Sequence, residues 1–160
     1  MNLSKILKNA FLIILASLVL TACATKKTST TTGQMQGDTY TGTDTVKELA
    51  KGVPDRVFFA TNESILTTAS RDTLRKQATW LRANSEITVV LEGHADERGT
   101  REYNLALGER RAAVISSFLR SAGVSSRQIE VVSYGEERPQ NPGHNSAAWA
   151  QNRRAVVEYR

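Results

Sequence analysis

The sequence predicts an α+β domain that spans residues 55–160. In this part of the chain, short runs of β-branched and aromatic residues alternate with two longer stretches of helical periodicity. The elements follow the order βαβαβ, and one further strand ends the chain. Such an order is typical of helices packed against a single sheet.

The individual elements are expected from hydrophobic spacing and turn residues. Strands are predicted at Arg56–Phe59, Glu86–His94, Gln128–Ser133 and Arg154–Tyr159. Helices are predicted at Thr67–Ala83, with Thr67 as N-cap and an apolar face of Leu74, Ala78 and Leu81, and at Tyr103–Ala122, closed by Gly123. A loop rich in proline and glycine precedes a single helical turn at 147–152.

Arg111 lies at the centre of the apolar face of the second predicted helix. The other residues on that face are Asn104, Leu107, Val114, Ile115 and Phe118. A charge in such a position is unfavourable unless it is paired. Three interpretations are open: an ion pair with Glu92 or Asp96, a long side chain that reaches water, or contact with a ligand.

The loop at 93–100 leaves the carboxyl end of a predicted strand, where ligands of open α/β sheets commonly bind. Asp96 and Glu97 supply negative charge, Arg98 supplies positive charge, and Gly99 permits an unusual backbone turn. Asp96 together with Arg111 would suit a zwitterion. A carboxylate binds an ammonium group, and a guanidinium group binds a carboxylate through two hydrogen bonds.

Two catalytic interpretations find little support. His94 and Asp96 have the spacing of a metal pair, but no cluster of His or Cys accompanies them, so the sequence predicts neither a metal site nor a cofactor. No serine lies in a nucleophile-elbow motif, which argues against a Ser-His-Asp hydrolase. The chain is therefore predicted not to be an enzyme.

Residues 1–22 have the pattern of an export signal, with a basic start and a short apolar core. The segment Leu20–Cys23 resembles the bacterial lipobox, so Cys23 is the predicted lipidation site. Two or more acyl chains on this cysteine would hold a membrane stably. Ala24 stands where an aspartate retains many lipoproteins in the inner membrane, which favours the outer membrane.

Residues 23–54 are predicted to be the lipidated cysteine followed by a flexible tether. Nine threonines and three glycines occur between Ala24 and Thr45, with almost nothing apolar. Loss of the leader with Lys5 and Lys8 reduces the formal charge from +5 to +3, so the charge balance predicts no nucleic-acid partner.

Four motifs carry a resemblance to a known family: Gly93–Thr100, Tyr103–Ala112, Ser133–Gly135 and Asn152–Val156. They closely resemble the OmpA-like peptidoglycan-binding domain, and the lipobox extends the likeness to the lipid-anchored members of the Tol-Pal system. The resemblance implies a sandwich of two helices on a mixed four-stranded sheet. It also implies non-covalent tethering of the outer membrane to the cell wall, in envelope integrity and cell division, and a periplasmic β-propeller protein as a partner that competes with the wall.

The family binds the diaminopimelate residue of peptidoglycan stem peptides without cleaving it. Carried over by motif, Asp96 would hold the ammonium group of diaminopimelate and Arg111 its carboxylate. Further pocket positions implied by the resemblance are Arg98, Thr100, Asn104, Leu107, Phe59, Ala60 and Thr61. The family commonly has acidic residues where this chain has Ala60 and Asn62. For Asn152, Arg153 and Arg154 we expect a role in folding or in partner contacts.

Two functions of other kinds remain as alternatives to a wall anchor. A wall-modifying hydrolase would need a catalytic acid or a zinc site. An OmpA-like module could also serve another envelope machine, such as a flagellar stator or a secretion anchor. Stator proteins keep a membrane-spanning helix in place of a lipobox, so Cys23 argues against that assignment.

The anchor can be tested by changing Cys23 to serine, because the hydroxyl cannot be acylated as the thiol is. We expect Cys23→Ser to leave the outer-membrane fraction once lysozyme has removed the wall. A serine variant that still sediments with that membrane without carrying lipid would contradict the prediction.

Overall fold

Four strands form one mixed sheet in the computed structural model, which describes residues 35–36 and 38–160. Their order across the sheet is β5 (Arg56–Phe58), β8 (Arg154–Tyr159), β6 (Val89–His94) and β7 (Ile129–Gly135). β8 pairs antiparallel with both β5 and β6, while β6 and β7 are parallel. The mixed four-stranded sheet expected from the sequence is confirmed.

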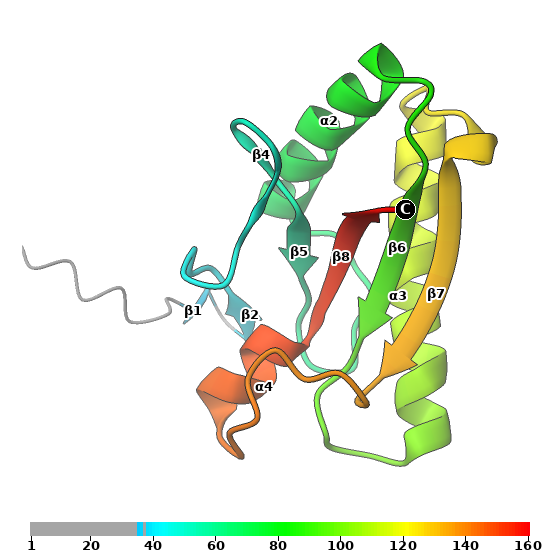
Figure 1. The fold of residues 1–160 in the computed structure, drawn as a ribbon. Coiled ribbons are helices and arrows are strands. Elements are labelled where there is room, and N and C mark those ends of the chain that lie inside the picture. The colour runs from blue at the N-terminus through cyan, green and yellow to red at the C-terminus, as the bar shows by residue number, and fades with distance from the viewer. Residues whose placement is uncertain (1–34, 37) are drawn as a thin grey trace, which may run out of the picture. The chain divides into compact units, whose positions relative to one another are not determined.

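Two long helices, α2 (Thr68–Ala83) and α3 (Arg101–Ser121), cover one face of this sheet (Figure 1). Their N-caps are Thr67 and Thr100, each of which accepts a backbone N–H three residues later. The core between helices and sheet contains Phe59, Leu74, Leu81, Val89, Leu91, Ala112, Ile115, Leu119, Ala155 and Val157. Burial of these side chains supplies the main favourable term in folding.

The predicted elements are present, with some boundaries moved. β6 begins three residues later than expected, because residues 84–87 form a turn in which Ile87 N donates to Asn84 O. The Gln128 side chain also donates to carbonyls of this turn and of the end of α2. Gln128 is the last residue of a short 3₁₀ helix, η1 (Ser126–Gln128), and β7 begins after it. α3 begins two residues earlier than Tyr103, because Thr100 caps it.

The strand directions bring three chain segments to one edge of the sheet. β5 and β6 both run opposite to β8, so the carboxyl ends of β5 and β6 lie beside the start of β8. Phe58 is opposite Arg154, and Gly93 is opposite Ala155. The residues after β5, the loop after β6 and Arg153 therefore meet at this edge.

Residues 35–36 and 38–54, which the sequence places in the tether, form two short hairpins in the structure. Their strands are β1 (Met35–Gln36), β2 (Thr39–Tyr40), β3 (Glu48–Ala50) and β4 (Val53–Pro54). Tyr40 and Leu49 are buried, and the Tyr40 ring packs edge-on against Phe58 at 4.8 Å between centroids. These two apolar side chains help to pack a threonine-rich segment onto the domain. A short helix, α4 (Ser146–Asn152), lies near β2 (Figure 1).

The expected leader, Cys23 and the first part of the tether lie outside the described residues. Within the part of the chain that the structure describes, no helix combines the length and apolarity needed to span a membrane.

α3 approaches the sheet closely where two glycines face each other. A Cβ atom added to Gly93 in β6 would lie 1.8 Å from the carbonyl oxygen of Gly108 in α3. A Cβ on Gly108 would lie 2.8 Å from the Gly93 oxygen. A Cβ on Gly108 would also lie 2.3 Å from Ser133 Oγ. Because each glycine also meets the backbone of the other, a side chain at either position requires the helix to move away from the sheet.

We expect Gly93→Ala to lower the free energy of unfolding by about 1–3 kcal/mol, the range of overpacked cores. The measurement is urea denaturation of the purified protein. Glu109→Ala, on the exposed side of α3, is the control and should change stability by less than about 0.5 kcal/mol. Equal midpoints for Gly93→Ala and the parent protein would show that the two backbones do not touch.

Candidate functional site

The Asp96 carboxylate lies at the sheet edge and is paired with two guanidinium groups. Arg98 Nε and Nη2 donate to its two oxygens at 3.0 and 2.7 Å, and Arg98 N donates at 3.1 Å. Arg153 Nη1 donates to Oδ2 at 3.2 Å. Burial alone would raise the pKa of Asp96, but the hydrogen bonds from Arg98 and Arg153 outweigh it and the pKa lies below its ordinary value. Asp96 is therefore charged at neutral pH.

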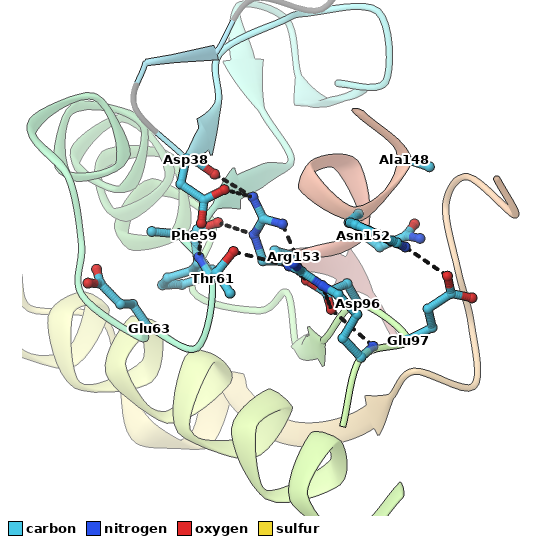
Figure 2. Close-up of polar contacts among 12 residues, drawn as sticks. Asp38, Phe59, Thr61, Glu63, Asp96, Glu97, Ala148, Asn152 and Arg153 are labelled. Atoms are coloured by element: carbon cyan, nitrogen blue, oxygen red, sulfur yellow. Dashed lines mark hydrogen bonds and ion pairs between the residues drawn. The ribbon is translucent and has the colours of Figure 1, made fainter. Parts of the chain in front are cut away.

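The two partners of Asp96 differ in exposure. The Arg98 side chain is 41% exposed, whereas that of Arg153 is 2% exposed. Arg153 is fixed by further contacts: its Nε donates to Phe59 O at 3.1 Å, and its Nη2 donates to Asp38. Figure 2 shows Arg153 between Asp38 and Asp96. Arg98 is thus the partner that can leave Asp96 without disturbing the core.

Arg111 is completely buried, and its hydrogen bonds go to backbone carbonyls. Its Nε donates to Glu63 O at 2.9 Å, Nη1 to His94 O at 2.8 Å and Nη2 to Ala60 O at 3.0 Å. Its guanidinium carbon lies 5.2 Å from the centre of the Phe59 ring. Burial and the nearby charge of Arg153 lower the pKa of Arg111 to about 10, so it is charged at neutral pH.

These contacts correct two interpretations of Arg111. The side chain forms no ion pair with Glu92 or Asp96 among the described residues, and it does not reach water. Carbonyl dipoles compensate its charge instead. Three of its five N–H groups are used within the described residues, which leaves two for another acceptor.

The other predicted pocket residues divide into two groups. Thr61 joins the Asp96 cluster, since its Oγ1 accepts from Arg98 at 3.1 Å, and Phe59 and Ala60 contribute their carbonyls. Thr100, Asn104 and Leu107 have structural roles in α3: Thr100 caps the helix, Asn104 donates to Glu136, and Leu107 is buried.

His94 does not pair with Asp96. Its ring stacks on Tyr134 at 5.7 Å between centroids, and its carbonyl, rather than its side chain, contacts Arg111. Burial, followed by the charge of Arg154, lowers the pKa of His94 to about 3, so the ring is neutral at neutral pH. Across the described residues, no group of three or more His, Cys, Asp or Glu side chains has the arrangement of a metal site.

A second polar cluster borders the first on the side of α4. Glu97 accepts from Trp149 Nε1 at 2.8 Å and faces His144 Nδ1 at 2.7 Å. The guanidinium group of Arg98 lies over the Trp149 ring at 4.4 Å from its centre. The stacking holds Arg98 beside Asp96 at the surface of the site.

Sequence reasoning missed Arg153, Asp38 and Trp149 as members of this region. Arg153 belongs to a motif of the family resemblance but was expected to serve folding or partner contacts. Asp38 lies in the predicted tether, and a lone Trp149 carries no local signal. Only the long-range contacts of the fold bring these residues to the site.

The comparisons with known proteins show which family this chain is similar to. A sequence model described as the OmpA family matches residues 58–153. The peptidoglycan-associated lipoprotein of Mesorhizobium japonicum is 42% identical over 146 residues, covering 90% of this chain and 87% of that protein. The crystal structure of the peptidoglycan-associated lipoprotein from Burkholderia pseudomallei is 39% identical, with a TM-score of 0.65, covering 66% of this chain and 90% of that one.

A more distant structure shares the fold alone. The C-terminal domain of Helicobacter pylori MotB is similar with a TM-score of 0.62 but is 18% identical, covering 66% of this chain and 84% of that one.

The role of Arg111 in stability can be measured with Arg111→Met, which keeps apolar bulk but removes the donors to three carbonyls. We expect the free energy of unfolding to fall by about 2–4 kcal/mol, because buried acceptors lose their partners. Arg110→Met, at the neighbouring exposed position, is the control and should change stability by less than about 0.5 kcal/mol. If both variants have the same melting temperature as the parent protein, the carbonyl contacts do not hold the site together.

Proposed function

The chain belongs to the OmpA family, and we propose that it binds peptidoglycan non-covalently and tethers the outer membrane to the cell wall. The observation that carries this proposal is the cluster at the sheet edge, where Asp96 lies among Arg98, Arg153 and Arg111. A site that offers both signs of charge fits a zwitterion. The relatives from Mesorhizobium japonicum and Burkholderia pseudomallei are named for their association with peptidoglycan.

The proposed ligand is the side-chain end of diaminopimelate in a stem peptide, which carries one ammonium group and one carboxylate. The ammonium group replaces the exposed Arg98 guanidinium at Asp96, while the buried Arg153 stays in place. The ligand carboxylate faces the positive side of the site. There the buried Arg111 supplies the deepest charge, and Thr61 N and Arg153 Nη2 are the donors that the ligand carboxylate meets.

Residues 59–63 form one side of the proposed ligand site, and they contribute to it through their backbone. Ala60 and Asn62 replace residues that are commonly acidic in the family, but the Ala60 carbonyl binds Arg111 whatever its side chain. Asn62 has a φ angle of 57°, a conformation that asparagine tolerates better than most residues. This turn aims the carbonyls of Ala60 and Glu63 at the same guanidinium group.

Three further parts of the proposal rest on the family resemblance. Cys23 carries the lipid, and residues between it and the first hairpin span the distance from membrane to domain. A periplasmic β-propeller protein of the Tol system binds a surface that includes Glu97 and Arg98 and so competes with the wall. The protein acts in envelope integrity and cell division as a structural anchor, not as an enzyme.

The arrangement at Asp96 generates a binding test. Asp96→Asn keeps the size of the side chain but removes the charge that holds the ligand ammonium. A hydrogen bond between charged groups contributes about 1.5–3 kcal/mol, and 1.4 kcal/mol is a tenfold change. We therefore expect purified peptidoglycan sacculi to bind Asp96→Asn at least about tenfold more weakly in a sedimentation assay.

Asp72→Asn on α2 is the matched control, because it makes the same charge change at a side chain that is 61% exposed. It should bind sacculi as the parent protein does. Thermal melts establish that both variants are folded. A folded Asp96→Asn that sediments with sacculi as strongly as the parent protein would overturn the proposed site.

A further inference from the structure

Asp38 reaches the site from a hairpin that lies outside the family match of residues 58–153. Its Oδ2 accepts a hydrogen bond from Thr61 N at 2.7 Å, and its Oδ1 accepts from Arg153 Nη2 at 3.0 Å. Its carbonyl also accepts from Arg153. Figure 2 shows Asp38, Thr61 and Arg153 pointing toward one another.

The groups around the Asp38 carboxylate form an anion-binding position. A backbone N–H and a guanidinium group converge on it, and Arg98 adds positive charge nearby. The hydrogen bond from Thr61 leads the effects that lower the pKa of Asp38, so the carboxylate is charged at neutral pH. Thr61 and Arg98 are also members of the proposed ligand site, so this anion-binding position lies within it.

The Asp38 side chain is 51% exposed, whereas Arg153 beneath it is 2% exposed. The donors are therefore fixed in the domain, and the acceptor is the removable part. Asp38 is held close by its sequence neighbour Tyr40, which is buried against Phe58. A carboxylate kept near its donors by a short stretch of chain acts at a high effective concentration, on the order of millimolar for short flexible connections.

We infer that Asp38 is a tethered competitor that occupies the position of the ligand carboxylate, so that wall binding requires the N-terminal hairpin to release it. The inference rests on the proposed function. It follows that a ligand must bring its own carboxylate to replace Asp38. The segment that links the domain to the proposed membrane anchor thereby influences the affinity for the wall.

The size of the effect follows from the fraction of molecules in which Asp38 leaves the position open. Apparent affinity falls in proportion to that fraction. If Asp38 fills the position in about 70–90% of molecules, its removal tightens ligand binding by about three- to tenfold. A residue that instead helped to hold the ligand would shift affinity in the opposite direction.

The experiment uses the full chain in detergent and a soluble muropeptide with a free diaminopimelate carboxylate as the probe. Asp38→Asn keeps the shape and removes the charge, and Asp38→Ala removes the acceptor. Calorimetric titration should give about three- to tenfold tighter binding for both. Asp44→Asn, an exposed carboxylate in the same segment, makes the same charge change and should bind as the parent protein does.

A second measurement, amide hydrogen exchange, reports on the anion-binding position directly. The Thr61 amide should exchange its hydrogen faster in Asp38→Ala, because it loses its acceptor, and added muropeptide should slow that exchange again. Unchanged exchange at Thr61 in the free variant would show that Asp38 does not occupy this donor.

The outcomes separate the two proposals. If the parent protein binds muropeptide and the Asp38 variants bind it equally or more weakly, the inference that Asp38 competes with the ligand is refuted, while the proposed anchor function stands. If neither the parent protein nor the variants bind, the proposed function fails, and the inference about Asp38 fails with it. If only the Asp38 variants bind measurably, Asp38 blocks the site more completely than expected.

Discussion

The burial of the Arg111 guanidinium group on three backbone carbonyls is the interaction on which the site depends. It joins α3 to the loop after β5, through Ala60 and Glu63, and to the end of β6, through His94. A buried cation needs compensation, and here partial charges on the backbone provide it. Because no carboxylate of the described residues pairs with Arg111, Asp96 remains available to pair with Arg98 and Arg153.

Compensation by carbonyls also leaves the site with three guanidinium groups. Arg98, Arg111 and Arg153 gather at one edge of the sheet, against the carboxylates of Asp96 and Asp38. The strand directions produce this gathering, since the ends of β5 and β6 and the start of β8 coincide.

The fold was largely predictable, because periodicity and caps are local properties of the sequence. Thr67 and Gly123 marked helix ends, and alternation marked β6, although Gln128 shortened that strand by binding the carbonyls of the preceding turn. The site was predictable only in part. Arg111 stood out on its apolar face, but its partners are backbone atoms, which leave no trace in the identity of the residues that carry them.

The two hairpins before β5 could not be predicted from local sequence properties either. A segment rich in threonine and glycine has little apolar content, which is typical of an unfolded tether. Tyr40 nevertheless packs against Phe58, and Leu49 is buried in the core. Whether such a segment packs onto the domain depends on a few apolar side chains and on a surface that distant parts of the chain form.

The stacking of Arg98 on Trp149 gives the molecule an internal optical reporter. The chain has two tryptophans, and the other, Trp80, packs against Tyr159 on α2 and β8. The indole of Trp149 donates to Glu97 and lies under the one guanidinium group that an incoming ammonium would displace from Asp96. Binding at the proposed site would therefore change the polarity around Trp149, and Trp80 would serve as the internal reference.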